Sequence, residues 1–147
     1  MKRNVLVTML GLTCTMGSAY AMDCAFLTVN LTNTTSNACK LVKQDVKHGY
    51  FSFFSSAPSY LKPGDTWGLI LQQSAYGPEI QLTYSCGDNT EITFTSQQDY
   101  CGFSSGHVMA TVDNAKNMTA TSQVNEGDWW GAQPGLINWQ FSELPSA

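Results

Sequence analysis

The stretch Ile80–Thr95, IQLTYSCGDNTEITFT, decides the fold that this chain is expected to adopt. From Ile80 to Cys86, apolar and polar residues alternate, which is the pattern of a strand with one buried face. Gly87-Asp88-Asn89 then supplies residue types that tolerate a positive φ in a turn. Because the alternation resumes at Ile92, the stretch predicts a β-hairpin.

Similar segments recur along the chain, separated by turn-forming residues, at a spacing of roughly ten residues. Residues 113–117 are expected to form one of the turns. The lysine-bearing segment Lys40–Lys47 suits a strand at an exposed edge of a sheet. About nine short strands at this spacing predict an all-β fold, an antiparallel β-sandwich, in a single domain of residues 22–147. The expected strands are Phe26–Asn33, Lys40–Lys47, Tyr50–Phe54, Trp67–Leu71, Ile80–Cys86, Ile92–Thr95, Val108–Val112, Met118–Ser122 and Ile137–Phe141.

The first 21 residues have the features of a cleaved signal peptide. Lys2-Arg3 gives a positive start, Val5–Gly17 is mostly apolar, and Ala19 and Ala21 are small residues where signal peptidase selects them. An uncut membrane anchor is the alternative, but the apolar run is short for a transmembrane helix. The sequence therefore predicts cleavage after Ala21 and a secreted or periplasmic protein.

Cleavage leaves four cysteines, and their even number predicts two disulfides in an oxidising compartment. These residues are Cys24, Cys39, Cys86 and Cys101. The sequence leaves the pairing of these cysteines open. The equal separations of Cys24 from Cys39 and of Cys86 from Cys101 favour two disulfides that each close a local loop. No cysteine pair has the spacing of a zinc knuckle and the chain has 2 histidines, so neither a metal site nor a cofactor is expected.

The charge of the chain argues against a nucleic-acid partner. Beyond residue 21 there are five lysines, no arginine and eleven acidic residues. Proteins that bind nucleic acid neutralise phosphates with a basic face and read bases chiefly with arginine. A weak basic patch near Lys40, Lys43 and Lys47 is more simply interpreted as a solvated strand face.

One motif suggests a nucleophile. Residues 102–106, GFSSG, match the Gly-x-Ser-x-Gly pattern around Ser104, and His107 follows directly. That pattern works on a strand-to-helix turn of a large α/β sheet, with the histidine arriving later in the chain. Here the next stretch alternates like a strand, so a small glycine and serine loop is the preferred interpretation.

Other catalytic sets depend on residues that lack a motif. His48 lies near Asp45, and because triads assemble in space, a small secreted hydrolase built on Ser104 or His48 stays a third hypothesis. Glycoside cleavage would need two carboxylates. Its candidates lie at turns or on the polar phase of strands, where solvated acids are expected: Glu79, Glu91, Glu126 and Glu143. The sequence therefore predicts no enzyme and no catalytic residue.

The tryptophans carry more information. Trp129 and Trp130 lie in a loop rich in glycine, aspartate and glutamine, and adjacent residues on a strand point to opposite faces, so at most one ring is easily buried. An exposed indole suits a membrane interface or the face of a sugar. The alternative is that both rings cover the end of the sandwich. Trp67 and Trp139, in alternating phase with apolar neighbours, are expected in the core.

Scattered positions, mainly between Leu27 and Phe51, carry a family resemblance: Asn33, Ser36, Lys40 and Gly49, the turn Leu61-Lys62-Pro63-Gly64, the segment Gln72-Gln73-Ser74 and the loop Tyr100-Cys101-Gly102-Phe103. They resemble the aegerolysin family, whose members are small β-sandwich proteins that recognise membrane lipids. His48 stands in place of an expected tryptophan. Family members also commonly lack a cleaved signal peptide and two disulfides, so the resemblance bears more on the fold than on lipid specificity.

These observations favour a secreted, disulfide-bonded, non-enzymatic module that recognises membrane lipid at an interface. Trp129 and Trp130 would insert or stack, Tyr76 and Phe103 would extend the patch from neighbouring turns, and Lys62 would meet phosphate. The family resemblance implies that any pore needs a larger partner protein. The alternative is a carbohydrate- or protein-binding module of the cell envelope or a host surface, which would use the same aromatic residues.

Overall fold

The computed structural model describes residues 23–102, 104–130 and 132–145. The predicted signal peptide and Phe103 lie outside the described residues. In the described part of the chain, no helix is long and apolar enough to span a membrane.

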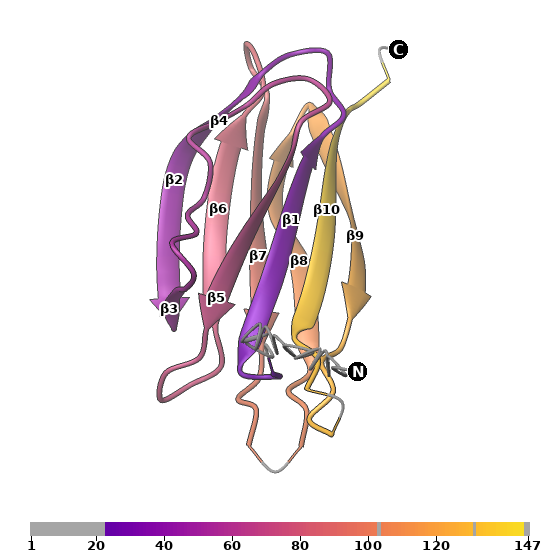
Figure 1. The fold of residues 1–147 in the computed structure, drawn as a ribbon. Helices are drawn as coiled ribbons and strands as arrows, with labels where there is room; N and C mark the ends of the chain where they lie inside the picture. The colour runs from indigo at the N-terminus through magenta and orange to yellow at the C-terminus, as the bar shows by residue number, and fades with distance from the viewer. Residues whose placement is uncertain (1–22, 103, 131, 146–147) are drawn as a thin grey trace, which may run out of the picture.

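The described residues form two five-stranded sheets that pack face to face, which confirms the all-β sandwich (Figure 1). Sheet A has the strand order β3-β5-β1-β10-β9, and sheet B has the order β4-β2-β6-β7-β8. Ten strands replace the expected nine or so, because a two-residue strand precedes the turn at Pro63. The strands are β1 (Phe26–Asn33), β2 (Cys39–His48), β3 (Tyr50–Phe51), β4 (Tyr60–Leu61), β5 (Thr66–Gln72), β6 (Glu79–Ser85), β7 (Glu91–Gln98), β8 (Val108–Lys116), β9 (Met118–Asn125) and β10 (Gly135–Glu143).

The predicted hairpin is the pair β6 and β7, in which Leu82 lies opposite Phe94. Its turn contains the expected positive φ angles, 102° at Gly87 and 56° at Asn89. The other pairs are antiparallel as well, except that β1 and β10 run parallel, with Leu31 opposite Trp139. Because these are the first and last strands, the long connection that a parallel pair requires is supplied by the rest of the chain.

The core lies between the sheets and is lined by alternate residues of both. Trp139 is buried as predicted, packs 4.8 Å from Phe94 between ring centroids, and donates its indole N–H to Ser96 Oγ at 2.9 Å. The prediction that Trp67 is also a core residue is wrong, since this side chain is 47% exposed. It follows the inward phase of β5, as the buried Leu69 and Leu71 do, but it is the second residue of that strand, and its indole N–H donates to Ser56 O at 3.0 Å.

Two strand boundaries differ from the prediction. Residues 113–117 are not a turn, because β8 continues to Lys116 and only Asn117, with φ of 55°, separates it from β9. Pairing with β7 overrides the turn preference of the Asp113 segment, whose carboxylate accepts a hydrogen bond from Thr95 Oγ1 at 2.6 Å. The strand expected over Tyr50–Phe54 is shorter than predicted: β3 ends at Phe51, because Phe53 and Phe54 have positive φ and carry the chain out of the sheet.

The two disulfides exist, but the expected local pairing is wrong: the bonds join Cys24 to Cys101 and Cys39 to Cys86. Cys39 begins β2 and Cys86 follows β6, and these strands are antiparallel neighbours with Lys40 opposite Ser85. Sheet pairing, rather than sequence separation, therefore brings the thiols together. Two disulfides suit an extracellular or otherwise oxidising compartment.

The two ends of the sandwich carry different connections (Figure 1). Short connections lie at one end, around residues 34–38, 62–65, 86–90 and at Asn117. Three longer loops lie at the other end, residues 73–78, 99–107 and 126–134, close to where the described chain begins. These three loops are called the loop end below.

Candidate binding surface at the loop end

Hydrogen bonds and a disulfide link the loops at this end to one another. The side-chain amide of Gln73 donates to Cys101 O at 3.0 Å, and the N–H of Cys101 donates back to Gln73 Oε1 at 2.8 Å. The disulfide from Cys101 to Cys24 then ties this pair to the segment that enters β1. Two of the loops and the chain's entry into the sandwich thus form one connected unit.

The third loop is attached through the serine motif and the histidine that follows it. Ser105 Oγ accepts the backbone N–H of Trp129 at 2.9 Å, and His107 Nδ1 contacts a carboxylate oxygen of Glu126. Gly106 is required for close backbone approach, because a Cβ atom there would come within 2.0 Å of Asp99 O. The motif that suggested a nucleophile therefore has a structural role in positioning the tryptophan loop.

The tryptophan loop presents both indoles outward. Trp129 is 42% exposed and Trp130 is 88% exposed, so the pair does not form a lid over the core. The rings contact each other edge to face, with centroids 4.6 Å apart and planes at 79°. Asp128 and Gln133 exchange backbone hydrogen bonds of 3.0 and 2.9 Å, and Asp128 Oδ1 also accepts the N–H of Trp130. The base of the loop is therefore closed, and the indoles project from it.

Further exposed aromatic residues lie at or beside this end. Tyr76 is exposed in its loop and packs against His48, with ring centroids 5.0 Å apart and planes tilted by 44°. Tyr100 is exposed in the neighbouring loop. Of the four aromatic candidates predicted from sequence, the structure brings Trp129, Trp130 and Tyr76 to one end, and it does not describe Phe103.

Sequence reasoning missed the aromatic turn after β3. Phe54 is fully exposed and Phe53 is half exposed, with its ring 5.3 Å from that of Phe26. Because β3 pairs with the last residues of β5, this turn emerges beside the loop end. The available signal was the run Phe51-Ser52-Phe53-Phe54, which lacks the strict alternation of a half-buried strand.

Lys62 does not belong to this surface. It follows β4 and lies in the turn before β5, where its N–H donates to Asp65 Oδ2 at 3.1 Å. That turn is at the end of β5 opposite to the one that joins the 73–78 loop. The predicted combination of Lys62 with the tryptophan pair is therefore not formed.

The loop end is acidic. Its three loops contain no lysine or arginine, and they carry Asp99, Glu126 and Asp128. The nearest lysine in the neighbouring strands is Lys47, whose ammonium lies 3.4 Å from Glu79. This surface therefore combines exposed aromatic rings with a small negative charge.

The catalytic candidates from the sequence are not joined to one another by hydrogen bonds. Among the described side chains, no hydrogen bond joins Ser104 to His107 or His48 to Asp45. Within the same residues there is no group of three or more His, Cys, Asp and Glu side chains placed to hold a metal ion.

The fold and the surface together define a class: a disulfide-bonded β-sandwich with an aromatic loop end. No family model matches the chain, and no curated protein matches its sequence. Similar solved structures include the lipid binding protein Nakanori, with a TM-score of 0.63 and 13% identity over 81% of this chain and 71% of that one. RahU, crystallised with TRIS, has a TM-score of 0.58 and 14% identity over 88% and 100% of the two chains.

A third similar structure is IP-1A from Alcaligenes faecalis, with a TM-score of 0.52 and 15% identity over 83% of this chain and 94% of that one. Because all of these identities are low, the likeness shows the fold alone. The sandwich architecture that the scattered resemblance implied is therefore present, whereas none of these comparisons shows membership of a family.

Proposed function

We propose that this chain is a secreted, non-enzymatic module that binds membrane lipid through the aromatic side chains of its loop end. The observation that carries the proposal is the exposure of Trp129 and Trp130 on a loop that is closed at its base and tied to its neighbour. The likeness to the lipid binding protein Nakanori supports the same class of ligand.

Indole rings suit the boundary between water and acyl chains, because they combine a large apolar surface with a polar N–H group. Tyr76 and Tyr100 extend the apolar surface from the adjacent loops, and Phe53 and Phe54 extend it from the turn after β3. Since the loops are linked by hydrogen bonds and a disulfide, little conformational entropy remains to be lost on binding.

The charge of the loop end favours one kind of membrane. Clusters of lysine and arginine attract anionic lipid by about 1 kcal/mol for each residue, and the three loops contain neither. Asp99, Glu126 and Asp128 oppose approach to an anionic surface. We therefore expect binding to membranes with neutral or zwitterionic headgroups, driven by apolar contact.

The sandwich would lie on the membrane surface as a peripheral protein. The disulfides and the predicted signal peptide agree with action outside the cytosol. A larger protein that forms a pore with this chain is implied by the family resemblance and is part of the proposal as a partner.

Vesicle flotation tests the proposal. Disulfide-bonded protein is mixed with phosphatidylcholine vesicles or with vesicles rich in phosphatidylserine, and co-flotation is measured for wild type and for the Trp129→Ala/Trp130→Ala variant. Wild type is expected to float with phosphatidylcholine, and the double variant is expected to stay in the dense fraction. Tyr60→Ala is the matched control, because Tyr60 is an exposed aromatic residue at the opposite end.

Two results would overturn the proposal: equal flotation of the double variant and wild type, or no flotation of wild type with any lipid. In the second case the exposed indoles would favour the alternative function, binding of a carbohydrate or protein surface by stacking. Loss of flotation caused by a free sugar would point to the same alternative.

A further inference from the structure

The outer face of sheet A is almost free of charge. The four strands β5, β1, β10 and β9 contain a single ionisable side chain, Glu143, at the last residue of β10. Sheet B is different, since each of its long strands carries acidic or basic residues, including Lys43, Asp45 and Asp113. Exposed sheet faces normally carry charges for solubility, so the neutrality of sheet A calls for an explanation.

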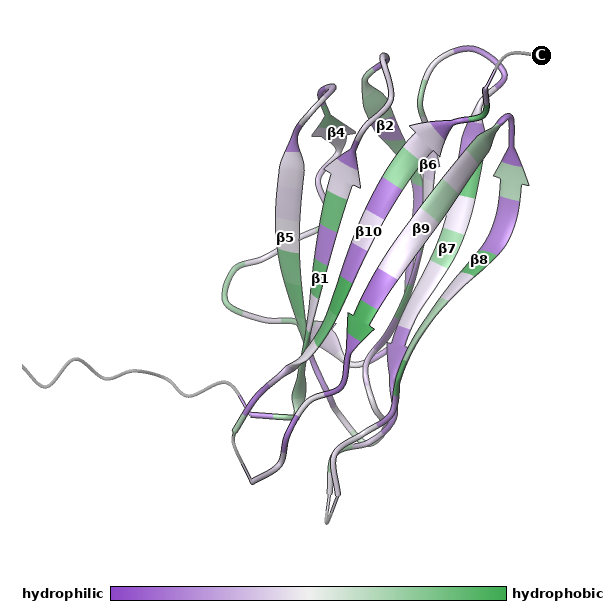
Figure 2. Ribbon diagram, turned by 90° about the vertical axis from the view of Figure 1, so that its right-hand side faces the viewer, coloured by the Kyte–Doolittle hydropathy of each residue, from purple (hydrophilic) through white to green (hydrophobic). Residues whose placement is uncertain are grey.

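The register of the strands arranges the outward side chains in two rows. The first row crosses Thr66, Thr32, Gln140 and Thr121, and the second crosses Gly68, Asn30, Asn138 and Gln123. Together they are called the amide–hydroxyl rows. Figure 2 shows the same alternation as hydrophobic and hydrophilic bands along β1 and β10. Because neighbouring strands lie about 4.8 Å apart, each row extends over about 14 Å.

Hydrogen bonds within the rows fix some of these side chains. Asn30 Nδ2 donates to Asn138 Oδ1 at 2.8 Å, and the hydroxyls of Thr32 and Thr66 are 2.9 Å apart. The first bond still leaves the carbonyl oxygen of Asn30 and the amide hydrogens of Asn138 to offer to a ligand. Gly68 keeps this part of the face open, because a Cβ atom there would lie 2.9 Å from Asn30 Oδ1.

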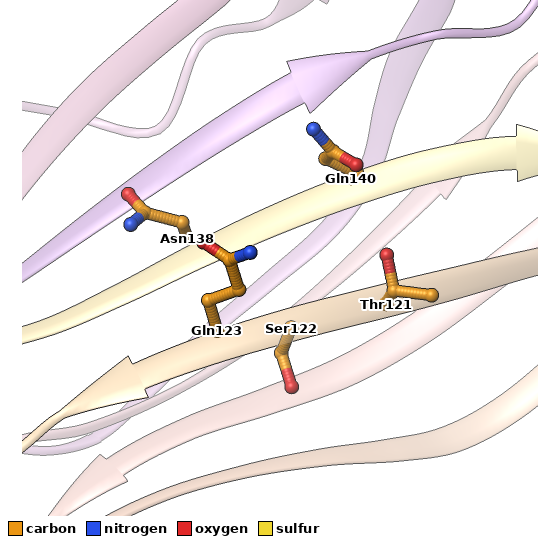
Figure 3. A pocket seen from close by; sticks show the side chains of 5 residues that line it. All are labelled: Thr121, Ser122, Gln123, Asn138 and Gln140. Atoms are coloured by element: carbon orange, nitrogen blue, oxygen red, sulfur yellow. The ribbon is translucent and has the colours of Figure 1, made fainter.

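A depression lies over the β9 and β10 side of the rows. Its volume is about 260 Å³, and it is lined by Thr121, Ser122, Gln123, Asn138 and Gln140. Figure 3 shows the Gln123 side chain extending from β9 toward β10, near Asn138, with Gln140 and Thr121 further along the two strands. This volume is slightly below the roughly 300 Å³ at which small-ligand sites begin, which suits one sugar ring better than a large cofactor.

We propose that the amide–hydroxyl rows bind a neutral glycan, with one sugar ring seated in the depression. Side-chain amides supply both donors and acceptors, and hydroxyl groups do the same, which matches the hydroxyl groups of a sugar. The absence of charge from these strands, Glu143 excepted, leaves no partner for an anionic or cationic ligand. The length of the rows suits a short oligosaccharide lying across β5, β1, β10 and β9.

This site is separate from the lipid surface. The rows run across the middle of sheet A, and none of their residues belongs to the loops 73–78, 99–107 or 126–134. Vesicle binding and glycan binding can therefore fail or succeed independently of each other.

Nuclear magnetic resonance titration tests the proposal on ¹⁵N-labelled, disulfide-bonded protein. The probes are maltohexaose, cellohexaose, mannohexaose and chitohexaose, with a heparin hexasaccharide as the charged comparison. At least one neutral probe is expected to shift the side-chain amide signals of Asn30, Gln123, Asn138 and Gln140 together with backbone signals of β9 and β10. The heparin probe is expected to leave them in place.

The variant Gln123→Ala/Asn138→Ala is expected to weaken binding of the active probe by about tenfold or more, since it removes two hydrogen-bonding side chains from the depression. Gln97→Ala/Asn114→Ala is the matched control, because it removes the same residue types from sheet B and should bind like wild type. Thr121→Lys, at an exposed edge position, fills the depression without disturbing the core and should also weaken binding.

The proposal is overturned if no neutral probe shifts the row signals, if the shifts are confined to the loop end, or if only the heparin probe binds. It is also overturned if the row signals move with protein concentration alone, since the face would then join two copies of the chain. Equal weakening by the sheet A and sheet B variants would likewise contradict it.

Discussion

The two tryptophans of the loop end should contribute unequally to membrane binding, in proportion to their exposure. Trp130 is 88% exposed and Trp129 is 42% exposed. A tryptophan side chain has about 250 Å² of surface, so the exposed areas are about 220 and 105 Å². At about 25 cal/mol/Å², immersing half of each area stabilises the bound state by about 2.7 and 1.3 kcal/mol.

These free energies convert to affinities. Trp130→Ala is expected to weaken binding to phosphatidylcholine bilayers by about 100-fold, and Trp129→Ala by about tenfold. Surface plasmon resonance on supported bilayers measures both affinities without relying on tryptophan fluorescence, and Tyr60→Ala serves as the control. Reversed order of the two variants, or two variants that bind like wild type, would refute the link between exposed area and membrane affinity.

Three further outcomes are expected. Peptide mapping without reduction should recover Cys39 joined to Cys86. The variant Cys39→Ala/Cys86→Ala should lower the free energy of unfolding, measured in urea, by about 4 kcal/mol, because this disulfide closes a loop with a sequence separation of 47. Burial raises the pKa of the Tyr84 phenol, so this group contributes stability that is fully present below its unfolded pKa of about 10 and is lost as the pH rises further. Tyr84→Phe should reduce that alkaline loss in thermal melts, while forfeiting the hydrogen bond to Pro58 O. Gly106→Ala should lower vesicle binding in flotation, because its Cβ would meet Asp99 O. Gly64→Ala is the control: its φ of 84° also strains an alanine, but its turn lies at the opposite end, so vesicle binding should be unchanged.

The sheet architecture could be predicted from the sequence where alternation and turn chemistry agree. The stretch from Ile80 to Thr95 is the clearest case, because its apolar phase, its turn glycine and its cross-strand partners all require the same hairpin. The strand boundaries were harder to predict from the sequence. The 113–117 segment has turn-forming residues, yet pairing with β7 extends it as a strand, and that pairing depends on residues far away in the chain.

The candidate site was predictable in part for the same reason. Adjacent tryptophans in a polar loop cannot both be buried easily, which identified Trp129 and Trp130. Lys62 could have been excluded from the sequence, because its turn precedes β5 and the loop of Tyr76 follows β5, which places the two at opposite ends of one strand. Trp67 illustrates the limit for burial, since its phase is inward like that of the buried Leu69, yet its position near the start of β5 leaves it 47% exposed.

The distribution of charge connects the two proposed surfaces. Four of the five lysines beyond residue 21 are Lys40, Lys43 and Lys47 on β2 and Lys116 on β8, all on strands of sheet B. The loop end therefore carries aromatic rings without cations, and the outer face of sheet A carries amides and hydroxyls almost without ions. A surface that must lose water to bind a neutral partner is best built without charged groups, because each buried charge lacking a partner would oppose binding. The opposite sheet then supplies the charge that keeps such a protein soluble, which leaves the loop end and the outer face of sheet A free to meet neutral ligands.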